Sequence, residues 1–177
     1  MLCGENTESL SASLEDYLEV IFHLEQSNRV ARAKDIAEQM GVQRASVTGA
    51  LKALSGRSLI NYSPYSFVTL TATGREIARE VIRRHKVLKE FFANTLQLGV
   101  KDAEANACRI EHAIDPAATE RLVRFLEFVS ICPRTGNDWF DAFGRFCKLG
   151  AQTSDCLACL KLCTERLQNR RPDAYES

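Results

Sequence analysis

Apolar residues recur at helical spacing in the first part of the chain. Between positions 14 and 24 they stand three and four residues apart, which predicts an amphipathic helix (Leu14, Tyr17, Leu18, Ile21, Phe22 and Leu24). A short second helix is expected over 33–40, where Gly41 ends it, and a third over 45–55 after a tight turn at 42–44. Small or apolar residues at the crossing, with a glycine in the turn, are typical of a helix-turn-helix.

The hydrophobic period then changes from helical to alternating and back. Stretches 59–63 and 67–71, joined by Pro64-Tyr65-Ser66, predict a β-hairpin, which after a third helix forms a wing. Further helices are expected over 72–96, 102–113 and 116–129. The predicted fold is mainly α: a winged helix-turn-helix domain (1–74), an all-helical domain (75–130) and a short cysteine-rich helical module (131–177).

Charge is distributed unevenly along a chain whose formal net charge is zero. From Arg29 to Lys89 there are twelve Lys or Arg and four Asp or Glu, a local net charge of +8. A basic domain inside a neutral chain suits phosphate binding, although a solvated basic face would have the same composition. Together with the helix-turn-helix and its wing, the charge favours double-stranded DNA as the partner.

The third helix supplies the residues expected to contact DNA. Its outward positions are small, hydrogen-bonding or basic, as suits insertion in the major groove (Arg44, Ser46, Thr48, Gly49 and Lys52). Arg57 and Arg75 are predicted to contact phosphates.

Potential metal ligands gather on the predicted helices. Cys108, Glu111 and His112 stand at i, i+3 and i+4, so they share one helix face, and Asp16 and Glu19 share a face of the first helix. His85 lies on the long helix between them in sequence. Thiolate, imidazole and carboxylate together suit iron(II), manganese or zinc better than calcium or magnesium. Taken separately, each group is also compatible with a solvated carboxylate or a small core cysteine.

These motifs together resemble the diphtheria toxin repressor family of iron- and manganese-dependent repressors. The resemblance rests on Ser13-Leu14-Glu15-Asp16-Tyr17-Leu18-Glu19, the winged helix-turn-helix, Arg84-His85-Lys86 and Cys108-Arg109-Ile110-Glu111-His112, in the family's order, over about residues 10–130. It implies a cytoplasmic metal-dependent repressor of metal-uptake genes, a homodimer through the helices after the wing, and a palindromic operator.

The resemblance also implies the ligand set Asp16, Glu19, His85, Cys108, Glu111 and His112. Asp16 with Glu19 resembles the manganese branch, whereas Cys108 resembles the iron branch, and the soft thiolate favours iron(II) over manganese. Lys89 stands where the iron branch has a carboxylate of a second site, so that ancillary site is expected to be altered or absent. Glu104 is a candidate substitute ligand there.

The last predicted module contains five of the seven cysteines: Cys132, Cys147, Cys156, Cys159 and Cys163. Four thiolates can hold zinc or an iron–sulfur cluster, which gives the hypothesis of a second, redox or metal, sensory site. Reduced thiols packed against Trp139 and Phe143 are the alternative.

Other functional classes fit the sequence less well. No apolar run is long enough for a membrane span, and the first residues lack the pattern of a secretory signal. A thiol enzyme needs a base near its cysteine, and the segment after 131 contains no histidine, so no enzymatic activity is expected. A winged-helix redox, zinc or iron–sulfur sensor acting through these cysteines is the nearer alternative.

Overall fold

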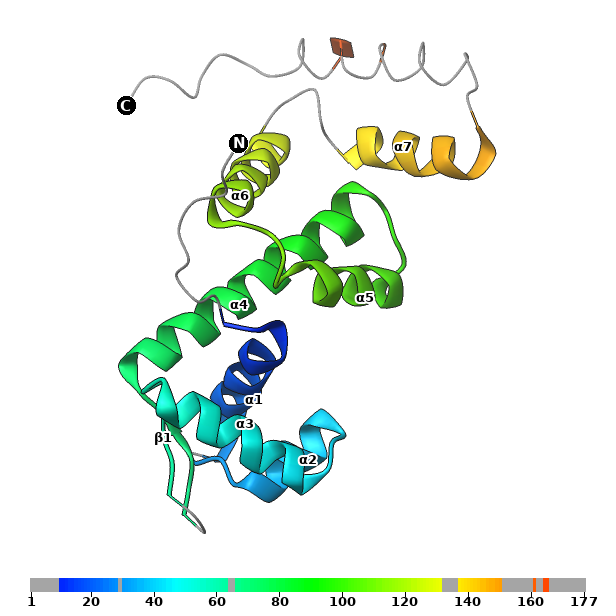
Figure 1. The fold of residues 1–177 in the computed structure, drawn as a ribbon. Helices are drawn as coiled ribbons and strands as arrows, with labels where there is room; N and C mark the ends of the chain where they lie inside the picture. Colours follow the sequence, from blue (N-terminus) through cyan, green and yellow to red (C-terminus); the bar gives the residue numbers. More distant parts are fainter. Residues whose placement is uncertain are drawn as a thin grey trace, which may run out of the picture. The chain divides into compact units, whose positions relative to one another are not determined.

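The computed structural model describes residues 10–28, 30–63, 66–131, 137–150, 161 and 164–165. The chain divides into two compact units, 1–84 and 85–177, each described by itself below. The division falls within α4 (Ala72–Glu90), a helix that begins in the first unit and ends in the second (Figure 1).

Three helices and a hairpin make up most of the first unit (Figure 1). The helices are α1 (Ala12–Asn28), α2 (Ala33–Met40) and α3 (Arg44–Gly56), and they pack on one another. Their core contains the fully buried Leu18, Ile21, Ile36, Val47, Leu51 and Leu54. These are the apolar positions that the helical spacing placed inward, so the helix-turn-helix is confirmed.

Two glycines allow close turns in this unit. Gly41 follows α2 at φ 66°, a left-handed conformation that L side chains rarely adopt, and its N–H bonds the carbonyl of Glu38. Gly74 lies in the first turn of α4, where an added Cβ would stand 2.0 Å from the carbonyl oxygen of Leu59. Gly74 therefore lets α4 start directly beside the wing.

The wing is shorter in regular pairing than the alternating pattern predicts. Strand β1 (Ile60–Asn61) pairs antiparallel with β2 (Thr69–Leu70), where 59–63 and 67–71 were expected. Val68 exchanges both of its backbone hydrogen bonds with Ala31, on the side of its strand that faces away from β1. The wing is thus joined to the segment just before α2.

A buried carboxylate connects α1 to both the wing and α4. The Glu25 side chain, 7% exposed, accepts a hydrogen bond of 2.8 Å from the backbone N–H of Leu70. Its second oxygen lies 2.6 Å from Nη2 of Arg75. Arg75, predicted to contact phosphate, thus forms an ion pair with Glu25 and stays partly exposed. The Arg84 guanidinium similarly reaches Glu15 of α1, at 3.3 Å.

The described residues of the second unit form helices joined by short turns. The end of α4 continues as the π-helical turn η1 (Phe91–Thr95), in which Leu96 N–H bonds the carbonyl of Phe91, five residues back. Then follow α5 (Val100–Ile110), α6 (Pro116–Ile131) and α7 (Asn137–Leu149). Asp115 caps α6, accepting the N–H of Ala118 at 2.7 Å.

Helix bounds differ from the predicted ones by a few residues, as helix ends commonly do. The predicted helix 72–96 ends as an α-helix at Glu90, because the chain widens into the π-turn. Helix α5 ends at Ile110 rather than 113, and Glu111 begins the turn that leads to α6. Within the part of the chain that the structure describes, no helix is both long and apolar enough to cross a membrane.

Candidate functional site

Helices α4 and α5 bring predicted metal ligands together in the second unit. His85 lies on α4, Cys108 lies on the last turn of α5, and Glu111 follows the end of that helix. Cys108 and Glu111 are three residues apart and so lie on the same helix face. This face is the one that meets His85.

Three donor atoms converge there. One ligand atom each of His85, Cys108 and Glu111 lies within 4.8 Å of the other two. His85 Nδ1 is 2.6 Å from Glu111 Oε2 and 3.9 Å from Cys108 Sγ. Ligand atoms around a transition metal stand about 3–4 Å apart, given bonds of about 2.0–2.3 Å. The trio therefore needs only a small adjustment to hold such an ion, and its nitrogen, sulfur and oxygen donors fit one.

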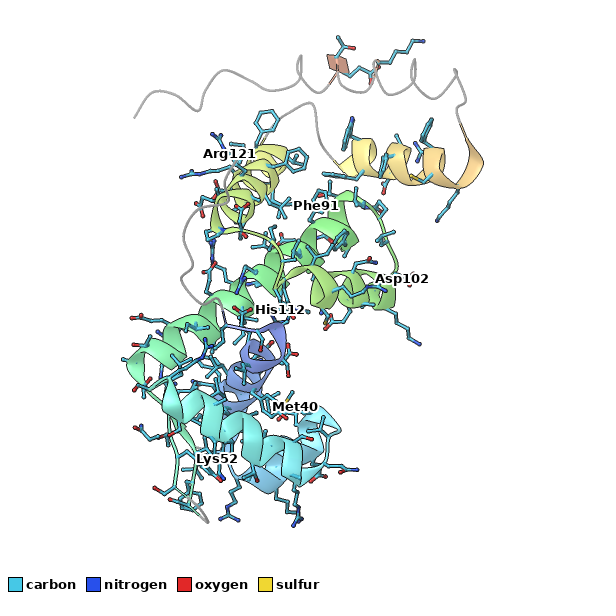
Figure 2. All side chains as sticks on the ribbon, viewed as in Figure 1. Met40, Lys52, Phe91, Asp102, His112 and Arg121 are labelled. Carbon is cyan, nitrogen blue, oxygen red and sulfur yellow. The ribbon has the colours of Figure 1, made fainter. Side chains whose placement is uncertain are left out.

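Glu111 is the buried member of the trio. Its side chain is 4% exposed, and its two oxygens face two imidazoles: Oε2 faces His85, and Oε1 is 3.3 Å from His112 Nε2. A buried carboxylate is costly unless it is paired, so the histidines are its compensation. His112, labelled in Figure 2, thus joins the same cluster through Glu111.

A second carboxylate lies on the far side of the His85 ring. Glu104 Oε1 is 3.3 Å from His85 Nε2, and Glu104 Oε2 is 2.6 Å from Lys89 Nζ. The hydrogen bond from the Lys89 ammonium is the main cause that lowers the pKa of the Glu104 carboxyl below its ordinary value. Glu104, a candidate substitute ligand of a second site, is thus paired with both His85 and Lys89, and its role as a ligand stays a prediction.

The other two predicted ligands belong to the first unit. Asp16 and Glu19 are both half-buried on α1, three residues apart. Glu19 Oε1 lies 3.5 Å from Nε2 of His23, one turn further along. Helical spacing places both carboxylates on one face, as expected.

Most of the predicted cysteine site lies outside the described residues. This holds for Cys132, Cys156, Cys159 and Cys163. Cys147 is described and lies exposed on α7. The hypothesis of a second site in this segment stays a prediction.

The first unit has a basic groove between the helix-turn-helix and the wing. Its volume is about 850 Å³. Residues of α3, of the segment around the start of α2, and of the wing line it: Arg32, Ala33, Lys34, Arg44, Thr48, Lys52, Tyr62, Ser66 and Phe67. Four of these are basic and none is acidic, which suits a phosphate backbone. Lys52 is labelled on α3 in Figure 2.

Three of the predicted DNA-contacting residues line this groove: Arg44, Thr48 and Lys52. Ser46 and Gly49 are exposed elsewhere on α3, and an added Cβ at Gly49 would meet nothing within 4 Å. Arg57 is exposed just after α3 ends. The helix surface is therefore open around these positions.

Sequence reasoning missed the contribution of Arg32, Lys34 and Phe67. The Arg32 guanidinium lies over the Phe67 ring, 5.1 Å from its centroid, directly beside the Ala31–Val68 bridge. Arg32 and Lys34 both belong to the basic segment 29–89. Their place at the groove depends on the Ala31–Val68 bridge, which joins residues 37 positions apart. The one signal in the local sequence was Phe67, an aromatic residue next to the wing tip, which is exposed in the structure.

Helix α6 has an exposed apolar face in the second unit. Phe125, Phe128 and Ile131 are 41%, 57% and 73% exposed, three residues apart. Phe125 also makes an edge-to-face contact with Phe91 of η1. A repeated apolar exposure of this kind is typical of a surface covered by another protein.

Comparisons with known proteins agree with these two units. Residues 9–68 match the family described as the iron dependent repressor N-terminal DNA binding domain. Residues 71–140 match the one described as the iron dependent repressor metal binding and dimerisation domain.

Individual relatives are also named as transcriptional regulators. An uncharacterised HTH-type transcriptional regulator of Methanocaldococcus jannaschii is 36% identical over 119 residues, or 67% of this chain and 95% of that protein. The HTH-type transcriptional regulator MntR of Shouchella clausii is 33% identical over 118 residues, or 66% and 80%. The solved structure of the manganese regulator SloR is 29% identical, with a TM-score of 0.59.

The match to SloR covers 68% of this chain and 56% of that chain, so this chain spans about half of the solved structure's length. The resemblance inferred from the motifs and the mainly α fold with its two N-terminal domains are confirmed. The chain therefore belongs to the iron-dependent repressor family, whose members are metal-dependent, DNA-binding transcriptional regulators.

Proposed function

We propose that this protein is a repressor that binds a palindromic operator as a homodimer when it holds iron(II). It would act in the cytoplasm, on metal-uptake genes. The convergence of His85, Cys108 and Glu111 donor atoms within 4.8 Å is the observation that carries the metal part of the proposal. The thiolate of Cys108 favours iron(II) over manganese, which prefers oxygen donors.

We assign six residues to the metal. The trio and His112 come from the second unit, and Asp16 and Glu19 of α1 complete the set. The support for the two α1 residues is their spacing on one helix face and the family to which the chain belongs. A bound metal would supply the positive charge that compensates the negative charges of the carboxylates and of the Cys108 thiolate. No reaction is part of this function.

The DNA part of the proposal rests on the groove of the first unit. Arg32, Lys34, Arg44 and Lys52 provide cations for phosphates, while exposed Ser46 and Gly49 and half-buried Thr48 let α3 approach base edges. Arg57 adds a cation at the end of α3. Two copies joined by the α6 face would present two such heads, so the operator should contain two symmetric half-sites.

Metal and DNA are linked through the arrangement of the heads. Asp16 and Glu19 lie on the helix that packs against α2 and α3, so a metal held from both units restricts where the DNA-reading helix stands. An ion that binds the DNA-competent arrangement more tightly shifts the population toward it. Coupling of this kind is commonly about 1–3 kcal/mol, or about 5–150-fold in DNA affinity.

Anaerobic DNA binding tests the proposal. The full chain is titrated onto a palindromic operator in the presence of iron(II), manganese(II) or zinc(II), as wild type and as His112→Ala. We expect metal-dependent binding in the wild type, strongest with iron(II), and its loss in the variant. Asn106→Ala, which truncates a polar side chain on α5, is the control and should keep the metal response.

Tight DNA binding without metal, unchanged by His112→Ala, would contradict the proposal. Metal-dependent binding with manganese as the strongest activator would keep the switch and overturn iron(II) as the corepressor.

A further inference from the structure

We propose that Glu104 is a positioning residue that orients the metal-ligating ring of His85, and that Lys89 holds Glu104 in this role. The inference rests on the metal site of the proposed function and deepens it. It starts from the fact that His85 has two ring nitrogens with different surroundings. Nδ1 faces Cys108 and Glu111, whereas Nε2 faces Glu104 at 3.3 Å.

Two pairs of residues at i and i+4 face each other across α4 and α5. His85 and Lys89 are one turn apart on α4, and Glu104 and Cys108 are one turn apart on α5. Each oxygen of Glu104 has its own partner: Oε1 faces His85, and Oε2 accepts from Lys89 at 2.6 Å. The carboxylate is therefore held at two points and cannot rotate without losing one of them.

This arrangement determines which nitrogen can bind metal. An imidazole that donates its Nε2–H to a carboxylate keeps the lone pair on Nδ1, and the ring plane is fixed by the same hydrogen bond. The 2.6 Å contact between Nδ1 and Glu111 Oε2 requires a proton between the two atoms, and a bound metal would replace that proton and use the Nδ1 lone pair beside Cys108 and Glu111. Glu104 thus selects both the tautomer and the orientation that the metal needs.

Lys89 gives Glu104 a partner that keeps it out of the metal's coordination shell. Glu104 faces the ring nitrogen opposite to the one that faces Cys108 and Glu111. The ammonium neutralises the carboxylate and occupies one of its oxygens. Both groups are about half exposed, 44% for Lys89 and 46% for Glu104, and such ion pairs add little to folding stability. Positioning, not stabilisation, is therefore the effect to measure.

Cobalt(II) is the probe for the test, because its visible absorption reports the geometry and identity of its ligands. The full chain is titrated anaerobically with cobalt(II) as wild type, Glu104→Ala, Glu104→Gln and Lys89→Gln. Asp102→Asn on α5 and Lys86→Gln on α4 are matched controls, since both are exposed and lose the same kind of charge. Thermal unfolding of each metal-free protein shows whether it is folded.

We expect Glu104→Ala to weaken cobalt(II) binding about 10–100-fold, the usual loss when a residue that orients a ligand is removed, and to change the cobalt spectrum. Glu104→Gln keeps an oxygen that can accept the Nε2–H, so it should recover part of the affinity. Lys89→Gln should weaken binding by less than Glu104→Ala. The two controls should match the wild type in affinity and spectrum.

Unchanged or tighter cobalt(II) binding with the wild-type spectrum in a folded Glu104→Ala would overturn the inference and leave the proposed function intact. A wild-type protein that binds no cobalt(II) would instead overturn the metal site of the proposed function.

Discussion

Two buried carboxylates, one in each unit, show how the two parts of this protein differ. The Glu25 side chain in the first unit is 7% exposed, and that of Glu111 in the second unit is 4% exposed. Glu25 is paired with a backbone N–H and an arginine, which offer no lone pair to a metal ion. Glu111 is paired with two histidines, whose ring nitrogens can also bind a metal ion.

The difference separates a structural carboxylate from one suited to function. The contacts of Glu25 tie α1 to the wing and to the start of α4 within the first unit. An imidazole can also bind a metal ion through a ring nitrogen, and Cys108 stands beside His85. The surroundings of Glu111 therefore offer donor atoms suited to a metal ion, whereas Glu25 has no comparable donors beside it.

Replacing Glu111 should give the largest effect, and it tests the metal-binding role of the buried carboxylate in the second unit. Four ligands hold structural zinc with about 10–16 kcal/mol, so one ligand contributes about 3 kcal/mol, or about 100-fold in affinity. We expect Glu111→Gln to weaken iron(II) or cobalt(II) binding by at least about that factor, measured by anaerobic titration. Glu90→Gln, an exposed change at the end of α4, is the control. Wild-type affinity in Glu111→Gln would remove it from the ligand set.

Replacing Glu25 tests the structural role of the buried carboxylate in the first unit. Glu25→Gln loses the ion pair with Arg75 and weakens the contact to Leu70, at a cost of about 2–4 kcal/mol in the free energy of unfolding. Urea denaturation of the metal-free chain measures this. Metal affinity should stay at the wild-type value, and a loss of metal binding comparable to that of Glu111→Gln would show that the two carboxylates do not have separate roles.

Replacing the thiolate of Cys108 should alter the metal preference of the site without removing a ligand. Cys108→Asp replaces a thiolate by a carboxylate, which manganese prefers. We expect the ratio of iron(II) to manganese(II) affinity to fall by about tenfold, a change of about 1.4 kcal/mol. Competition titrations with both metals measure the ratio. A ratio equal to that of the wild type would mean that Cys108 does not contact the metal.

The smallest expected effect is in the groove of the first unit. Lys52→Ala should lower operator affinity without changing metal affinity, and should reduce the slope of log affinity against log salt by about 1. Fluorescence anisotropy over a range of salt concentrations measures the slope. Lys101→Ala, an exposed change in the second unit, is the control. If Lys101→Ala changes the slope as much as Lys52→Ala does, Lys52 is not a phosphate contact.

Much of the first unit was predictable because its information is local. The inward positions Val47, Leu51 and Leu54 follow from helical spacing alone, and Gly41 marks the turn. Cys108 and Glu111 could be placed on one face for the same reason. The roles of Arg75 and Val68 could not be predicted in this way. Arg75 lies beside Glu25, 50 residues earlier, and Val68 pairs with Ala31.

The sequence by itself determined the winged helix-turn-helix, the order of the later helices and the chemical kinds of donor, since these depend on periodicity and residue type within a few turns. Only the tertiary structure decided which donors meet. It placed Nδ1 of His85 against Glu111 and Cys108, and Nε2 against Glu104 with Lys89 behind it. The reason is that the packing of α4 on α5 determines which side chains face each other, and no local pattern in either helix encodes that register.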